Sequence, residues 1–223
     1  MAEQYSPVVR ARTESILATN SVIRNTYILL SMSLLFSAAM AGVAIIINAP
    51  PMGLLTLIGY FGLFFLCNAL RNSVWGIAAV FALTGFMGYT LGPILNFYIT
   101  HLANGSQIVM TALGGTGAIF LGLSAYALTT RKDFSYLTGF LMSASMVLFV
   151  AIIISIFFPL PLFQLIISSA FMLFASAMIL FETSNIIHGG ETNYILATIS
   201  LYVSIYNLFI SLLHILTAFS GRE

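Results

Sequence analysis

Charged residues are scarce in this sequence. Its 223 residues include seven Lys or Arg and six Asp or Glu, which is 6% of the chain, whereas soluble domains carry about 25%. Hydrophobic residues make up 60%, and the mean hydropathy is +1.06. Too little polar material remains to cover a water-soluble globule, so the composition predicts a membrane protein. The net charge of +1 leaves no basic stripe for nucleic acid.

Residues that usually carry out chemistry are rare as well. The one cysteine, Cys67, lies in an apolar run, which excludes a disulfide framework and a cysteine metal site. The sole aspartate is Asp133, outside the apolar runs, whereas an aspartyl intramembrane protease needs two aspartates within its spans. Ser124 and His214 only superficially match a serine–histidine pair, because no glycine follows Ser124. We therefore expect no enzymatic activity, no cofactor and no metal site.

Apolar runs long enough to cross a bilayer fill the chain from residue 25 onward. A helix needs about 20 residues to cross about 30 Å of hydrocarbon. The breaks between the runs are short, so successive helices must be antiparallel neighbours. We expect an all-α fold, a single bundle of seven transmembrane helices at 25–223, preceded by a polar tail at 1–24. The expected spans are Thr26–Ile47, Met52–Leu70, Val74–Thr100, Gln107–Leu128, Tyr136–Phe158, Leu162–Ile187 and Tyr194–Phe219.

Basic residues predict the orientation, because cytoplasmic loops retain Lys and Arg. With the N-terminus inside, only Arg222 falls on the opposite side. We therefore expect a cytoplasmic N-terminus and a C-terminus outside. The first apolar run is too long for a signal-peptide core and should be retained as an anchor. The basic residues on the cytoplasmic side would be Arg10, Arg12, Arg24, Arg71, Arg131 and Lys132.

Small residues suggest where helices pack closely. Glycines or alanines recur about every four positions in the third and fourth spans, a spacing typical of tight helix contacts in membranes. Pro93 removes a backbone donor from the third span and is expected to bend or loosen it, either as a static kink or for gating. The small-residue sets are Gly85, Gly88 and Gly92, and Gly114, Ala118 and Gly122.

The last span carries a stripe of polar and small residues. Its polar members include Ser204, Asn207 and His214. A lipid-facing helix would not keep such a face, so we expect this helix at the centre of the bundle. Two interpretations stay open, a hydrogen-bonded packing seam and a polar pathway or ion site.

Glu182 is the only acidic residue within a predicted span. An intramembrane carboxylate costs about 2.5–3.5 kcal/mol at a helix centre, although Glu182 lies near the cytoplasmic end, where snorkelling to water is the alternative. Arg71 is its expected partner. The candidate polar or ion site is therefore Glu182, Ser204, Asn207, His214 and Arg71.

Three segments resemble the Bax inhibitor-1 family, the transmembrane Bax-inhibitor-motif proteins. They are Gly88–Leu95, Phe181–Ile187 and Ser200–Phe209, in the family's order. The resemblance covers nearly all of the chain beyond the tail. It implies a seven-helix bundle with the last helix central.

For some members, the family resemblance implies a pH-sensitive calcium leak governed by two acidic residues. Glu182 matches the first acid, whereas Ser204 stands where the pattern has an aspartate. The likeness is greatest to enterobacterial inner-membrane members that associate with and restrain the membrane-anchored AAA protease FtsH. The resemblance therefore implies a regulatory protein of the bacterial inner membrane that binds and inhibits FtsH, with a calcium or cation leak as the alternative. The polar tail is the segment that such a protease could grip.

Overall fold

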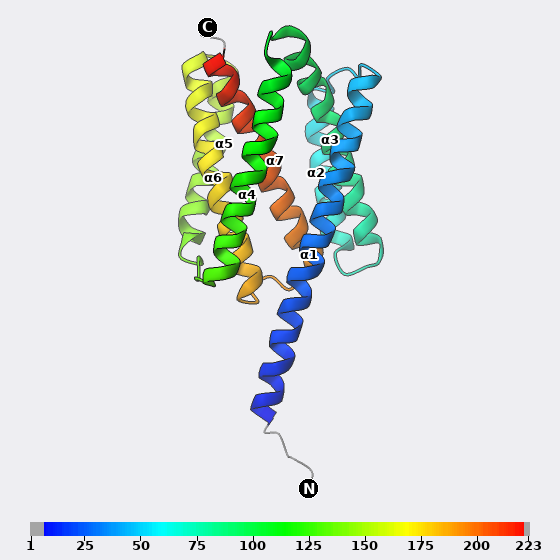
Figure 1. Cartoon of the computed structure of the whole chain (residues 1–223), viewed down its shortest axis with the longest axis vertical. Helices are drawn as coiled ribbons and strands as arrows, with labels where there is room; N and C mark the ends of the chain where they lie inside the picture. The colour runs from blue at the N-terminus through cyan, green and yellow to red at the C-terminus, as the bar shows by residue number, and fades with distance from the viewer. Residues whose placement is uncertain (1–6, 221–223) are drawn as a thin grey trace.

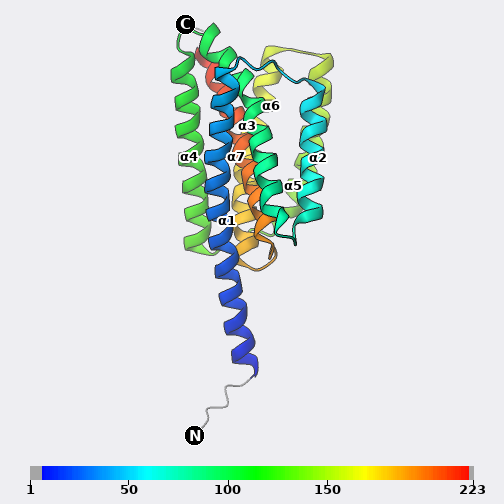
Figure 2. The ribbon, with the colours of Figure 1, turned by 90° about the vertical axis from the view of Figure 1, so that its right-hand side faces the viewer.

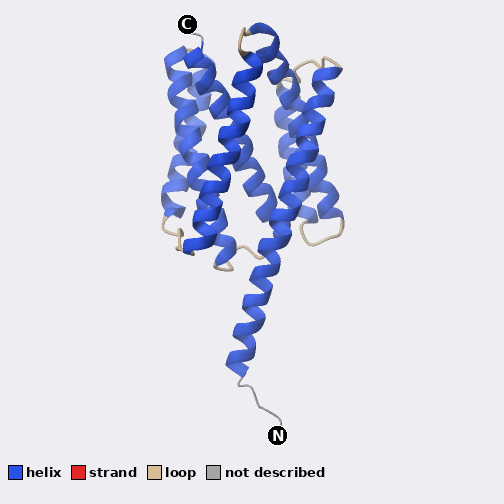
Figure 3. Cartoon of the chain, in the orientation of Figure 1, coloured by secondary structure: helices blue, strands red, loops and turns tan. Residues whose placement is uncertain are grey.

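The computed structural model describes the backbone of residues 7–220 and the side chains of residues 21–220. Within that part of the chain every regular element is an α-helix, and the helices run alternately up and down (Figures 1 and 3). The expected all-α fold is confirmed. The helices are α1 (Pro7–Ile46), α2 (Leu54–Leu70), α3 (Trp75–His101), α4 (Gly105–Thr130), α5 (Leu137–Phe157), α6 (Pro161–Ile187) and α7 (Tyr194–Ser220).

In the described part of the chain, six helices are long and apolar enough to cross a membrane. They are α3 to α7 and the Ser21–Ile46 part of α1. With 17 residues, α2 is shorter and rises about 25 Å. The chain is thus a multi-pass membrane protein. We call the end of the bundle where α6 ends and α7 begins the entry end, and the end where α7 finishes the far end (Figure 1).

The first helix starts much earlier than the sequence predicted. It forms one continuous helix of 40 residues from Pro7, whereas the expected span began at Thr26. Residues 8–41 contain neither glycine nor proline, so nothing interrupts the helix where the apolar run ends. The N-terminal part of α1 extends beyond the entry end of the bundle (Figure 2). Residues 1–6 of the expected polar tail lie outside the described residues.

Close helix packing occurs along α3 as expected. A side chain at Gly88 would collide with the backbone of Ser37, and one at Gly92 would collide with Ala44. These glycines let α1 and α3 approach closely enough for extensive dispersion contact.

The expected packing surface on α4 is wrong. A Cβ added at Gly114 or Gly122 would meet no atom within 4 Å, and Ala118 is exposed. This face of α4 has no protein neighbour among the described residues. Small residues at four-residue spacing permit a helix contact but do not require one.

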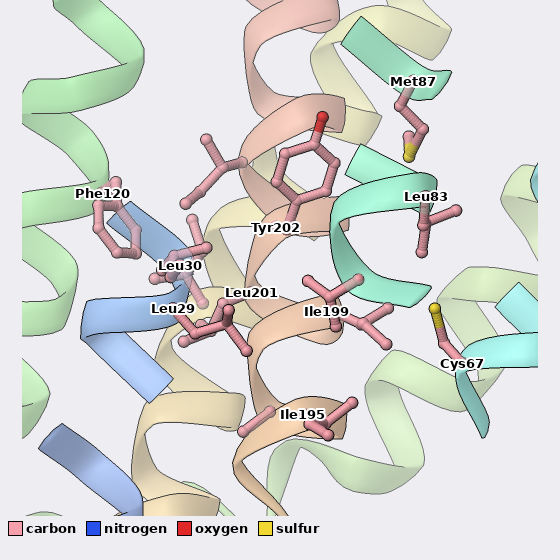
Figure 4. Packing of buried hydrophobic residues seen from close by; sticks show 14 of the residues in the cluster. Leu29, Leu30, Cys67, Leu83, Met87, Phe120, Ile195, Ile199, Leu201 and Tyr202 are labelled. Atoms are coloured by element: carbon pink, nitrogen blue, oxygen red, sulfur yellow. The ribbon is translucent and has the colours of Figure 1, made fainter. Parts of the chain in front are cut away.

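Helix α7 contacts α1, α2, α3, α4 and α6. Of its most apolar window, 61% is buried, compared with 50% for α3 and 11% for α5. Its most buried side chains are large: Tyr202, Leu201 and Ile199 lie within a core shared with α1, α2 and α3 (Figure 4). Large apolar side chains of α7 therefore contribute to the core of the bundle, in addition to the residues of its polar stripe.

Candidate functional site

Glu182 lies near the end of α6, at the entry end of the bundle. Its side chain is half-buried and faces Ser200 of α7, and the loop residue Glu191 is the nearby charge. The expected partnership with Arg71 is not formed, because the exposed Arg71 guanidinium donates to Asn68 at the end of α2, at 3.4 Å. Among the side chains of residues 21–220, the carboxyl group of Glu182 thus meets a hydroxyl and not a cation.

Ser204 and Asn207 continue the same face of α7 toward the middle of the bundle. The Ser204 hydroxyl donates to the carbonyl of Ser200 at 2.9 Å. Ser200, Ser204 and Asn207 together line a small cavity of about 140 Å³ between α2, α6 and α7, whose other walls include Tyr60 and Phe174. Three of the residues of the candidate site, Glu182, Ser204 and Asn207, therefore follow one polar line along the α6–α7 interface.

His214 belongs to a different place. It lies ten residues after Ser204, which is about 15 Å along a helix, and its Nδ1 lies 3.4 Å from the Ser168 hydroxyl. It lines a cavity of about 540 Å³ at the far end, together with Tyr98 and Gln164. The structure brings Glu182, Ser204 and Asn207 into one line, and it leaves Arg71 and His214 apart from them.

Pro93 lies inside the second half of α3, and the helix continues through it to His101. Leu91 and Leu95, two residues before and after it, are buried in a cluster with residues of α1, α4 and α7. Pro93 therefore belongs to the packed part of the bundle and is remote in sequence and in contacts from the Glu182 line.

Sequence reasoning missed a buried hydrogen-bond network centred on Tyr202. The Tyr202 hydroxyl donates to the backbone carbonyl of Thr84 in α3, at 3.2 Å. The hydroxyl of Ser37 in α1 lies 2.6 Å from it and donates to it, since the Tyr202 proton is already used. This network ties α1, α3 and α7 together at their core. Tyr202 lies within a segment that resembles the family, but nothing in the sequence shows which helices hold its partners.

Two further polar residues hold the loops at the entry end. The Asn193 side chain accepts hydrogen bonds from the amides of Ile195 and Leu196, at 3.0 and 3.3 Å, and so caps α7. The same side chain donates to the carbonyl of Arg71 at 2.9 Å, which joins the α2–α3 loop to the start of α7. An Asn directly before an apolar run is a sequence signal for such a cap.

Ser184 has the corresponding role for the α4–α5 loop. Its hydroxyl accepts from the amide of Phe134 at 3.0 Å and donates to the carbonyl of Lys132 at 3.1 Å. In that loop the Ser135 amide donates to Asp133 at 2.8 Å, which lowers the pKa of the exposed Asp133 carboxyl below its ordinary value. Among the described residues, no three His, Cys, Asp or Glu side chains are grouped to hold a metal ion.

Within residues 7–220, seven helices run alternately up and down, and a line of partly buried polar side chains follows the α6–α7 interface. These features define a polytopic α-helical membrane protein. The model of the family described as inhibitor of apoptosis-promoting Bax1 matches residues 19–221. The chain belongs to this family, the Bax inhibitor-1 family, and the resemblance drawn from the three sequence segments is confirmed.

Several relatives match along nearly their whole length. The chain is 52% identical over 210 residues, 94% of each chain, to a protein of Escherichia coli K12 named modulator of FtsH protease YccA. A relative from another E. coli strain, with the same identity and coverage, is named inner membrane protein YccA. The chain is also 56% identical over 205 residues, 92% of each chain, to the uncharacterized protein PA2604 of Pseudomonas aeruginosa.

Proposed function

We propose that this chain is a regulatory protein of the bacterial inner membrane that binds the membrane-anchored AAA protease FtsH and restrains its degradation of membrane substrates. The observation that carries the proposal is the 52% identity, over 94% of both chains, with a protein named for modulating that protease. A regulator of this kind needs a recognition surface and no catalytic centre. We propose that the chain has no enzymatic activity of its own.

We also propose that all seven helices cross the membrane, with the N-terminus in the cytoplasm, the C-terminus in the periplasm and α7 at the centre. Helix α1 ends at the far end and α3 begins at the entry end, with α2 running between them (Figure 1), and this course supports a crossing by α2. Arg71, Arg131 and Lys132 lie in or beside loops of the entry end, which supports a cytoplasmic position for that end. Reporter fusions at Ala2 and Glu223 should report opposite compartments. Equal reports would contradict an odd number of crossings.

The part of α1 that extends beyond the bundle is our proposed contact with the protease. Residues 7–20 add about 21 Å of helix beyond the apolar part of α1. Their sequence includes Arg10, Arg12 and Glu14. In the proposed orientation this segment projects into the cytoplasm, where the ATPase and protease domains of an AAA protease act.

Co-purification tests the partnership. The tagged protein, extracted from native membranes in mild detergent, should retain FtsH. Replacing Arg10 and Arg12 with Ala should weaken that retention. The matched control replaces Arg131 and Lys132 with Ala, which removes the same charge at the same end of the bundle, and should leave retention unchanged. No FtsH with the unaltered protein would contradict the proposal, whereas equal retention by both variants would contradict only the role of the α1 extension.

The alternative function is a calcium or cation leak along the Glu182 line. The arrangement of Glu182, Ser204 and Asn207 in one line along the α6–α7 interface favours this alternative. A cation passing this line would meet one carboxylate, with hydroxyl and amide oxygens as its other ligands. Calcium sites usually combine several carboxylates with other oxygen ligands. Because this line has one carboxylate, we favour a protease regulator over a calcium leak.

A further inference from the structure

A crevice of about 430 Å³ lies between α1 and α4. One wall includes Ala38 and Gly42 of α1, the other includes Gly117 of α4, and Ile205 and Tyr206 of α7 form part of the floor. The backbones of α1 and α4 do not come into contact along residues 7–220. Helix α7 is therefore visible between them in Figure 1, and the open side of the crevice faces the bilayer.

An aromatic pair lies at the limit of the crevice on the side of the entry end. The ring centroid of Phe120, in α4, lies 6.2 Å from that of Tyr27, in α1. Phe120 points toward Leu30 of α1 (Figure 4), and it also lines the crevice. The lining of α1 runs from Leu34 to Ile45, within its membrane-crossing part Ser21–Ile46. The crevice therefore lies at hydrocarbon depth, and on the side of the entry end its lining along α4 stops at Phe120.

Three of the four hydroxyl groups of the lining, those of Ser37, Thr116 and Tyr202, are already hydrogen-bonded within the protein. Tyr202 donates to Thr84 and receives the proton of Ser37. The Thr116 hydroxyl donates to the carbonyl of Ala112 at 2.7 Å.

Tyr206, the remaining hydroxyl of the lining, lies against the Thr90 side chain. None of the lining residues is charged. A ligand in the crevice would thus find hydrocarbon contacts and no unused hydroxyl proton at Ser37, Thr116 or Tyr202.

We propose that this crevice binds an acyl chain of a membrane lipid. Its volume falls within the range of small-ligand pockets, and an unfilled apolar space would forfeit the dispersion contacts of its walls. Along α4 the lining extends only from Leu113 to Phe120, about 10 Å, which is a third of the bilayer's hydrocarbon thickness. Along α1 it extends from Leu34 to Ile45, about 16 Å, so a transmembrane helix of a partner would contact the crevice over at most about half of the hydrocarbon thickness. A single acyl chain, entering from the bilayer, would contact α1, α4 and α7 at once and so link α1 to α4, which do not contact each other directly.

Photo-crosslinking in vesicles tests this proposal. The purified protein is reconstituted with phosphatidylethanolamine, phosphatidylglycerol and a trace of a phospholipid that carries a diazirine in mid-chain. After illumination, mass spectrometry locates the lipid adducts. Adducts should be concentrated in the crevice relative to the exposed residues Met146 and Val147 of α5, which contacts only α6 among the described helices.

Filling the crevice provides the matched comparison. A Cβ at Gly117, Gly42 or Gly114 would meet nothing within 4 Å, and only Gly117 and Gly42 line the crevice. Gly117→Phe should reduce crevice adducts roughly tenfold, about the effect of displacing two methylene groups. Gly42→Phe, from the opposite wall, should act in the same way. Gly114→Phe should leave the adducts unchanged, and thermal unfolding in detergent verifies that each variant is folded.

Three results would overturn the proposal. Adducts spread equally over the crevice and α5 would show ordinary solvation by lipid. Unchanged crevice adducts in folded Gly117→Phe and Gly42→Phe would show that the labelled chain lies elsewhere. A photoreactive amino acid at position 117 that captures one discrete membrane protein, and no lipid, would identify the crevice as a protein-binding groove.

Discussion

Removing one oxygen atom from Tyr202 should weaken the bundle measurably. Tyr202→Phe keeps the ring, which is 1% exposed in the core, so no large cavity forms. It removes the hydrogen bond to Thr84 and leaves Ser37 without its acceptor. Interhelical hydrogen bonds in membranes average about 0.6 kcal/mol and reach about 1.7 kcal/mol. For two such bonds we expect a loss of about 1–2 kcal/mol in the free energy of unfolding.

Steric trapping, which monitors reversible unfolding in bicelles, measures this loss of unfolding free energy. The control is Tyr136→Phe, which removes the same atom from a side chain that is 73% exposed, and it should change the stability by less than about 0.5 kcal/mol. A double-mutant cycle with Ser37→Ala isolates the pair and should give a coupling of about 0.6–1.7 kcal/mol. A coupling near zero, or equal effects of Tyr202→Phe and Tyr136→Phe, would refute the reasoning.

Three other changes have defined outcomes. Asn193→Ala removes the cap of α7 and should cost about 1 kcal/mol of unfolding free energy, whereas a cost no larger than that of Asn104→Ala, at a helix start without a side-chain cap, would exclude a capping role. Deleting residues 1–19 should leave the thermal stability of the bundle unchanged and alter either the turnover of the protein or its effect on FtsH; no change in either would refute a role for the α1 extension. Ser204→Asp should increase calcium flux into liposomes and make it dependent on pH between about 6 and 8, because it places a second carboxylate on the Glu182 line; strong flux through the unaltered protein that survives Glu182→Gln would place the pathway elsewhere.

The positions of the helices could be predicted because bilayer thickness sets the length of an apolar run. The ends of α2 to α7 lie within three residues of the expected spans. The start of α1 could not be predicted in this way. Hydropathy reports where a helix leaves hydrocarbon, whereas helix continuity depends on breakers, and the sequence from Val8 to Ala41 contains no glycine or proline.

The sequence could not show which residues contact one another across the bundle. The spacing of Gly114 and Gly122 is compatible with a helix contact and with an open face, and only the tertiary arrangement distinguishes them. Likewise, the residue pattern of α7 predicted its stripe of small and polar residues. The buried hydrogen-bond network could not be predicted, because Tyr202 meets Ser37 and Thr84 from distant parts of the chain. Spacing along one helix correctly placed Ser204 and Asn207 on one face. It could not determine that His214 lies against Ser168 at the far end.

The rate at which FtsH degrades a membrane substrate tests the central claim most directly. FtsH and a known membrane substrate are reconstituted in liposomes with ATP, with and without an excess of this protein. The account predicts slower degradation in proportion to the amount of protein added, while hydrolysis of a soluble peptide in the same vesicles stays unchanged. Degradation of the membrane substrate at the same rate with and without the protein would contradict the account.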